Sequence, residues 1–142
     1  MTNKLHIIAV FILVLIGSIN IRGQNKLNEN AIELVFVSID EGFSSGNVNH
    51  FSSSLSGKIY INLKNYYRGY FSGGQLYTIF DEFFELYIPI EFEYDKVSFE
   101  SETPFATGVF KFIHNGKREE SNFFISLNKE GGSWSISQVT IH

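Results

Sequence analysis

Apolar residues recur at helical spacing in the stretch that begins near residue 32. The stripe is made by Ile32, Val35, Phe36, Ile39 and Phe43. These positions follow i, i+3, i+4, i+7 and i+11, which is the spacing of one face of an amphipathic helix. The pattern therefore predicts a helix that turns this face toward a core. A shorter second helix is expected over residues 47–54, where Val48, Phe51 and Leu55 would point inward.

The clearest helical pattern lies between residues 72 and 87. Ser72 precedes it and Gln75 stands three positions later, which is the spacing of a capping box. Apolar residues then follow at a period near 3.6, and they are Leu76, Ile79, Phe80, Phe83, Phe84 and Tyr87. Pro89 cannot continue a helix, so the helix is predicted to end before it. Phe80 and Phe83 are predicted to be core residues.

The remaining pattern alternates with a period of two, which is typical of strands. Strands are predicted over residues 58–63, 90–99, 105–114, 119–128 and 133–141, and residues 66–70 are interpreted as a turn or a short strand. The apolar phase slips near Asp95 and Lys96, which indicates a bulge. Asn115-Gly116 is a strong hairpin signal, because a tight two-residue turn needs positive φ at both positions.

This order of elements predicts an α+β domain. Hairpins join neighbouring strands in antiparallel fashion, so most of the sheet is expected to be antiparallel. The compact arrangement is a curved antiparallel sheet with two or three N-terminal helices packed on one face. The domain is expected to span residues 31–142, after a loose lead-in over residues 24–30.

The first 23 residues have the pattern of a signal peptide. Lys4 gives a basic start, residues 7–16 are apolar without interruption, and Gly23 offers a small residue at the end. The alternative is an uncleaved membrane anchor, but the apolar stretch is shorter than the roughly 20 residues that a spanning helix needs. We therefore expect export to the periplasm or cell envelope, or to the cell exterior, with membrane contact only if the signal is uncleaved.

Charge and cysteine content narrow the classes of partner. Removal of residues 1–23 lowers Lys plus Arg from 11 to 9 and leaves all 15 acidic residues, so the net charge changes from −4 to 9 − 15 = −6. An acidic domain is unsuited to a nucleic-acid partner, which needs a basic surface. The chain has no cysteine, so disulfides and thiol nucleophiles are excluded. Stability must come from an aromatic core.

Three sequence patterns resemble a known family. They are Ser45-Gly46-Asn47, the segment from Tyr70 to Phe84 that contains Phe80-Asp81-Glu82-Phe83-Phe84, and the ending Gly131 to Ile141. In this order they resemble the DUF4783 family, which comprises exported proteins of Bacteroidetes with the NTF2-like (cystatin-like) fold. The resemblance implies a cone of helices wrapped by a bent sheet. It implies no activity, because fold alone does not define function.

The sequence offers few residues of the types that catalytic or metal sites need. An isomerase of the ketosteroid type would need a carboxylate base and an oxyanion donor inside the cone. The acidic row Glu91, Glu93 and Asp95 fits the solvent face of a strand better than a metal site. His50 and His114 stand apart and the chain contains no zinc-binding spacing, so no metal and no cofactor are expected.

One cluster stands out as a recognition surface, and its members are Tyr66, Tyr67, Arg68 and Tyr70. Arg beside aromatic rings can form forked bonds to carboxylates and can stack on ring faces. The alternative is that Tyr67 and Tyr70 are half-buried edge residues and Arg68 pairs with a nearby acid. We therefore expect a non-catalytic binding or scaffolding module of the cell envelope, with a protein partner or a second copy bound through the sheet. The alternative hypothesis is a small-ligand-binding protein or a ketosteroid-isomerase-like enzyme that uses the cone pocket.

Overall fold

The computed structural model describes residues 2–100 and 102–142, with side chains described from residue 23 onward. The chain divides into two units at residues 31 and 32, and the second unit, Ile32–His142, contains the whole sheet. Helix α1 spans Thr2–Ser45, so residues 24–30 are helical where we expected a loose lead-in. The expected signal peptide falls where side chains are not described and stays a prediction. In the described residues, no helix is both long and apolar enough to cross a membrane.

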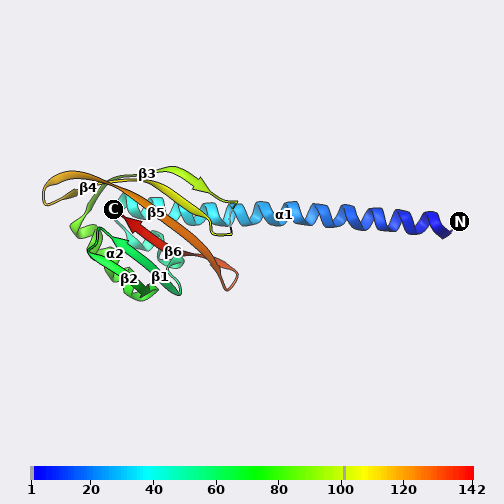
Figure 1. Cartoon of the computed structure of the whole chain (residues 1–142), viewed down its shortest axis with the longest axis horizontal. Coiled ribbons are helices and arrows are strands. Elements are labelled where there is room, and N and C mark those ends of the chain that lie inside the picture. The colour runs from blue at the N-terminus through cyan, green and yellow to red at the C-terminus, as the bar shows by residue number, and fades with distance from the viewer. Residues whose placement is uncertain (1, 101) are drawn as a thin grey trace. The chain divides into compact units, whose positions relative to one another are not determined.

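Six strands form one sheet in the order β2-β1-β6-β5-β4-β3 (Figure 1). Their bounds are β1 Lys58–Leu63, β2 Tyr67–Ser72, β3 Ile88–Ser98, β4 Phe105–His114, β5 Lys117–Glu130 and β6 Ser133–Ile141. Consecutive strands that are neighbours in the sheet pair in antiparallel fashion.

The sheet is mixed, which corrects the expectation of an antiparallel sheet. Strands β1 and β6 run parallel, with Tyr60 opposite Gln138 and Leu63 opposite Ile141. Hairpin signals determine only how strands close in sequence pair with each other. The contact between β1 and β6 joins segments far apart in the chain, so no local signal set its direction.

Helix α2, Gly73–Leu86, matches the predicted helix. The Ser72 side chain accepts a hydrogen bond from the Gln75 backbone, and the Gln75 side chain accepts from the Ser72 backbone, so the capping box is complete. This helix follows β2 and is not N-terminal to the sheet.

The expected short helix over residues 47–54 is instead two 3-10 turns, η1 Val48–His50 and η2 Ser52–Ser54. Phe51 has φ −119° and ψ 8° between them, which interrupts the helical backbone. The Phe51 ring is 0 % exposed, and its burial outweighs the local preference for a continuous helix. The domain therefore has two α-helices, not three.

The core is built around Phe43, near the end of α1. Its ring contacts five other phenylalanine rings, which come from α2, β3, β4 and the 3-10 region, at centroid distances of 4.8 to 5.9 Å. These rings are Phe51, Phe80, Phe84, Phe92 and Phe110. Phe80 and Phe83 are 0 % exposed, which confirms the predicted phase of α2. The helices and the sheet therefore meet in a filled aromatic interior.

Two predicted irregularities are confirmed. The register of β3 against β4 shifts between Tyr94 and Lys96, where the apolar phase slips. Asn115 and Gly116 have φ of 51° and 75°, as a tight hairpin between β4 and β5 requires. A second tight turn at Lys64 and Asn65, with φ of 54° and 61°, joins β1 to β2. Tyr66 closes that turn by donating its backbone N–H to the Leu63 carbonyl at 2.9 Å.

Candidate functional site

The interior is where a cone-type enzyme would hold its catalytic groups. In the described part of the chain, the buried polar side chains are five hydroxyls, and they belong to Ser54, Ser121, Ser126, Ser135 and Thr140. No described carboxylate is buried among them, so they offer no general base of the isomerase type. The space between the helices and the sheet is occupied by phenylalanine rings.

Tyr94 is partly buried and packs against this core. Its hydroxyl donates a hydrogen bond to the backbone carbonyl of Phe36 at 2.7 Å, which ties β3 to α1. Burial, assisted by the charge of Asp40, raises the pKa of Tyr94 well above its usual range. The hydroxyl therefore stays protonated and has a structural partner.

Strand β2 divides the four predicted site residues between two faces of the sheet. Tyr67 and Phe71 pack against the core, whereas Arg68 and Tyr70 are exposed on the opposite face. Tyr66 lies before the strand, beside the turn, and is 63 % exposed. The predicted residues are therefore neighbours in sequence but do not form one surface, because successive side chains of a strand point to opposite faces.

The first surface lies on the face of the sheet away from α2, and we call it the outer-face patch: Tyr60, Arg68 and Tyr70. The Arg68 Nε donates a hydrogen bond to the Tyr60 hydroxyl at 3.3 Å. The rings of Tyr60 and Tyr70 meet edge to face, with centroids 5.3 Å apart. Tyr70 is 72 % exposed, so its ring is available to a partner. The patch combines a cation with two aromatic faces at the edge of the sheet.

The second surface faces α2, and it contains Tyr66, Tyr67, Glu82 and Tyr87. The Tyr67 hydroxyl donates to the Glu82 carboxylate, and the ring of Tyr66 stands edge to face against Tyr67 at 5.0 Å. The hydrogen bond to Glu82 raises the pKa of Tyr67 to about 12. Burial, and then the charge of Glu119, raises the pKa of Tyr87. The phenols of Tyr67 and Tyr87 are therefore protonated at neutral pH, and the bond from Tyr67 to Glu82 fastens β2 to α2.

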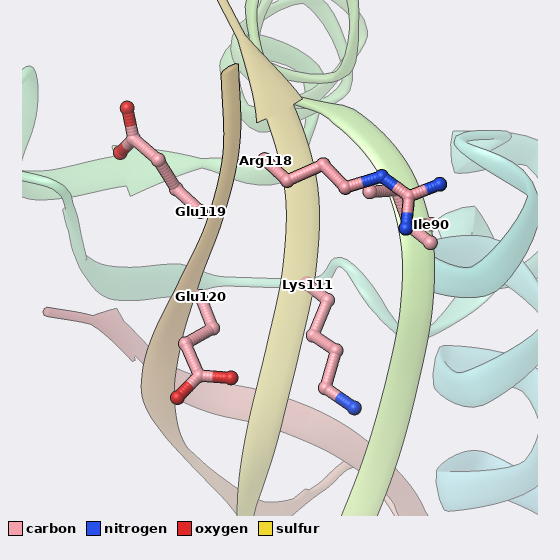
Figure 2. A pocket seen from close by; sticks show the side chains of 5 residues that line it. All are labelled: Ile90, Lys111, Arg118, Glu119 and Glu120. Atoms are coloured by element: carbon pink, nitrogen blue, oxygen red, sulfur yellow. The ribbon is translucent and has the colours of Figure 1, made fainter.

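A shallow pocket of about 280 Å³ lies on the outer face near the far edge of the sheet, and its lining is Ile90, Lys111, Arg118, Glu119 and Glu120 (Figure 2). Figure 2 shows Arg118 reaching from β5 across β4 toward Ile90 on β3. Lys111 bonds to Glu91 at 2.6 Å, and this hydrogen bond raises the pKa of Lys111. The two cations are matched by neighbouring glutamates, so the pocket has no net preference for an anion.

The predicted acidic row is part of the exposed strand surface. Glu91 is paired with Lys111, and Asp95 accepts a hydrogen bond from the Thr107 hydroxyl at 2.7 Å. Within residues 2–100 and 102–142, no group of three or more His, Asp or Glu side chains is arranged to hold a metal ion.

Tyr60 and Glu82 belong to these surfaces but were not among the predicted site residues. Tyr60 joins Arg68 and Tyr70 only because β1 pairs with β2 in a register that places Tyr60 opposite Tyr70. Glu82 reaches Tyr67 because α2 packs back on the strand that precedes it. If residues 67–71 had been read as a strand, their alternation would have placed Tyr67 and Arg68 on opposite faces. Their partners Glu82 and Tyr60 could be found only from the tertiary structure.

Comparison with known proteins decides the family. The family model "Domain of unknown function (DUF4783)" matches residues 36–142. The chain belongs to the DUF4783 family. The predicted family membership is thus confirmed, and the match covers the strands, α2 and the core-facing end of α1. A search of curated proteins found no match.

Solved structures show the same fold at low identity. A DUF4783 protein from Bacteroides uniformis is 15% identical, with a TM-score of 0.65 over 73% of this chain and 92% of that chain. One from Bacteroides fragilis is 16% identical, with a TM-score of 0.64 over 74% and 94%. An NTF2-like protein from Anabaena variabilis is 14% identical, with a TM-score of 0.63 over 80% and 89%. The DUF4783 fold of this chain is therefore NTF2-like, as predicted.

Proposed function

We propose that this DUF4783 protein is an exported, non-catalytic binding or scaffolding module of the cell envelope, and that it binds a protein partner through β2. The observation that supports it is the outer-face patch, where Arg68 and Tyr70 are exposed at a sheet edge. Tyrosine and arginine are enriched among the residues that contribute most to protein interfaces. The patch therefore has the chemistry of a recognition surface.

The packing of the interior supports a surface role over an interior one. Phe43 is in contact with five rings, and its side chain is 0 % exposed. A small-ligand site is normally a concave cavity of several hundred Å³ with a few convergent polar groups. A ligand in this interior would have to displace packed phenylalanines, which costs stability. The isomerase-like alternative therefore has no observation in its favour.

The arrangement of Arg68 supports a partner that presents acceptors or an aromatic ring. Its Nε is used by Tyr60, while the two terminal nitrogens project from an exposed side chain. Arg can bind a carboxylate through two parallel hydrogen bonds and can also stack on an aromatic face. A partner that carries such groups along an extended segment would fit the strand edge.

The test compares capture by three forms of the full chain from its own cell envelope. Wild type, the double variant Arg68→Ala/Tyr70→Ala, and the matched control Glu93→Ala are used as bait. Glu93 is exposed on β3 at the opposite edge of the sheet, so its loss should change nothing. The proposal expects a protein that binds wild type and the control but not the double variant, and that binds purified wild type directly. Equal capture by all three forms would show that β2 is not the binding surface.

Export is tested separately by N-terminal sequencing of the protein recovered from the envelope fraction. We expect the mature protein to begin near Gln24. Recovery of a form that still begins at Met1 would favour a membrane-tethered protein.

A further inference from the structure

The two edges of the sheet differ in how they are protected. Strand β3 has two register shifts, between Pro89 and Glu91 and between Tyr94 and Lys96. Four of its six exposed positions carry charge, at Glu91, Glu93, Asp95 and Lys96, and the other two are Ile88 and Ile90. Bulges, proline and charges on an edge strand are the devices that prevent pairing with another chain. The β3 edge is therefore guarded against strand addition.

Strand β2 has fewer of these protections. It pairs with β1 in an unbroken register of six residues, from Lys58 opposite Ser72 to Leu63 opposite Tyr67. It contains no proline, and its single charge is Arg68. In the sheet formed by the described residues, β2 has a strand on one side only. Its other row of backbone N–H and C=O groups is a template for a further strand.

Gly69 stands in the middle of this edge. Its φ of 141° lies in the region that residues with a side chain rarely adopt. A Cβ at this position would meet nothing closer than 3.7 Å, from the Phe71 ring, so the backbone conformation and not space explains the glycine. A glycine within a strand often marks a place where another backbone approaches closely.

We propose that the occupant of this edge is a second copy of the chain, whose β2 pairs antiparallel with β2 about a twofold axis at Gly69. This inference rests on the proposed function, since it names the partner of the same strand. It differs from association through the flat outer face of the sheet, because the strands join edge to edge and extend one continuous sheet. The argument is the self-complementarity of the strand.

Only three symmetric registers within the central part of β2 keep the core-facing side chains on one face. Side chains alternate with a period of two, so the axis must pass through a residue, and the candidates are Arg68, Gly69 and Tyr70. An axis at Arg68 places two arginines opposite each other, and like charges directly opposite are destabilising. An axis at Tyr70 sets Arg68 opposite Ser72, so the arginine has no aromatic ring directly opposite it.

The axis at Gly69 gives favourable pairs on both faces. On the outer face, Arg68 of each copy lies opposite Tyr70 of the other, which makes two cation–π pairs. On the core-facing side, Tyr67 lies opposite Phe71, so aromatic rings meet across the new strand pair. The residue without a side chain lies at the axis, beside its own copy on the other strand. The contact is small, so the dimer is weak and depends on concentration.

The test exchanges charges at positions that lie opposite each other only in this register. The dissociation constant of the dimer is measured by sedimentation equilibrium at physiological salt. The sample is the protein with the N-terminus that the cell produces. The wild-type dimer should have a dissociation constant below about 1 mM. Tyr70→Lys would place a lysine opposite Arg68 twice, and the dissociation constant should rise at least about tenfold. The double variant Arg68→Glu/Tyr70→Lys places Glu opposite Lys twice and should recover dimerisation. Tyr70 is 72 % exposed, so these changes should leave the fold intact, which circular dichroism checks.

A second measurement uses the absence of cysteine in the chain. A mixture of the single variants Arg68→Cys and Tyr70→Cys should form a disulfide-linked heterodimer on mild oxidation, faster than either variant alone, because only positions 68 and 70 lie directly opposite. If a charge variant fails to fold, this cross-linking pattern alone supports or overturns the register.

The outcomes separate the two proposals. A wild-type chain that is monomeric at about 1 mM, or a double variant that dimerises no better than Tyr70→Lys, overturns pairing about Gly69. If the chain is monomeric but Arg68→Ala/Tyr70→Ala still loses a captured protein, the binding surface stands and its partner is another protein. If the dimer forms but capture is unchanged in the variant, the self-pairing stands and the wider binding role of β2 fails.

Discussion

Removal of the Phe43 ring is the sharpest test of the filled interior. Phe43→Ala deletes a side chain that is 0 % exposed and touches rings contributed by the 3-10 region, α2, β3 and β4. A buried aromatic side chain removes about 150–250 Å² from water, which at about 25 cal/mol per Å² is roughly 4–6 kcal/mol. Measured Phe→Ala substitutions in cores cost about 3–5 kcal/mol, so we expect a loss of about 4 kcal/mol.

That loss is large for a domain of this size. Small domains have total stabilities of about 5–15 kcal/mol, so the variant should keep its fold with a reduced margin or unfold in part at room temperature. The melting temperature should fall by roughly 15 °C. The cavity would be apolar, and apolar cavities of this kind can take up benzene, so benzene should restore part of the lost stability.

The assay is urea unfolding followed by the fluorescence of the single tryptophan, Trp134, and by far-UV circular dichroism. The matched control is Tyr66→Ala, which removes an aromatic ring that is 63 % exposed and should change stability by less than about 0.5 kcal/mol. A loss below about 1 kcal/mol for Phe43→Ala would refute the filled interior, because the ring could not then be the centre of a packed core. Such a result would reopen the possibility of an interior ligand site.

Three further predictions concern other parts of the domain. Phe83→Ala should cost about 3–5 kcal/mol in the same assay, and a loss below about 1 kcal/mol would contradict the observed phase of α2. Gly108→Ala should cost at least about 1–3 kcal/mol, because the new Cβ would overlap the carbonyl oxygen of Glu93 and force β3 from β4; a neutral effect on the urea midpoint would contradict this close approach. Tyr67, whose pKa is raised to about 12, should ionise later than free tyrosine in an absorbance titration at high pH, and Glu82→Gln should bring its ionisation back toward 10. Since the folded pKa is above the unfolded one, the stabilisation from this bond is complete below pH 10 and is lost as the pH rises through 12; titration curves that coincide for the two forms would contradict the bond.

Local signals predicted those elements whose interactions lie within a few residues. The capping box at Ser72 and Gln75 placed the start of α2, and the positive φ demanded at Asn115 placed the β4–β5 turn. Hydrophobic periodicity identified the buried face of α1 around Phe43. These predictions succeeded because each depends on backbone sterics or on the spacing of a single element.

The candidate site was only half predictable. The sequence picked out residues 66–70, but a segment that could be a turn or a strand has no defined faces. The strand conformation of β2 separated Tyr67 from Arg68, and only its pairing with β1 supplied Tyr60 as the third member of the patch. The packing of α2 supplied Glu82.

By itself, the sequence determined the aromatic core, the helix α2 and the β4–β5 hairpin, the absence of disulfides and the family. Each of these follows from composition, from residue spacing or from the order of motifs. The tertiary structure alone decided the parallel contact of β1 with β6, the break of the expected short helix at Phe51, and the exposure of the β2 edge. These features depend on contacts between segments far apart in the chain, where burial of a ring or completion of a sheet outweighs local preference. The strand that carries Arg68 and Tyr70 lies at an edge only because the rest of the sheet was assembled on its other side.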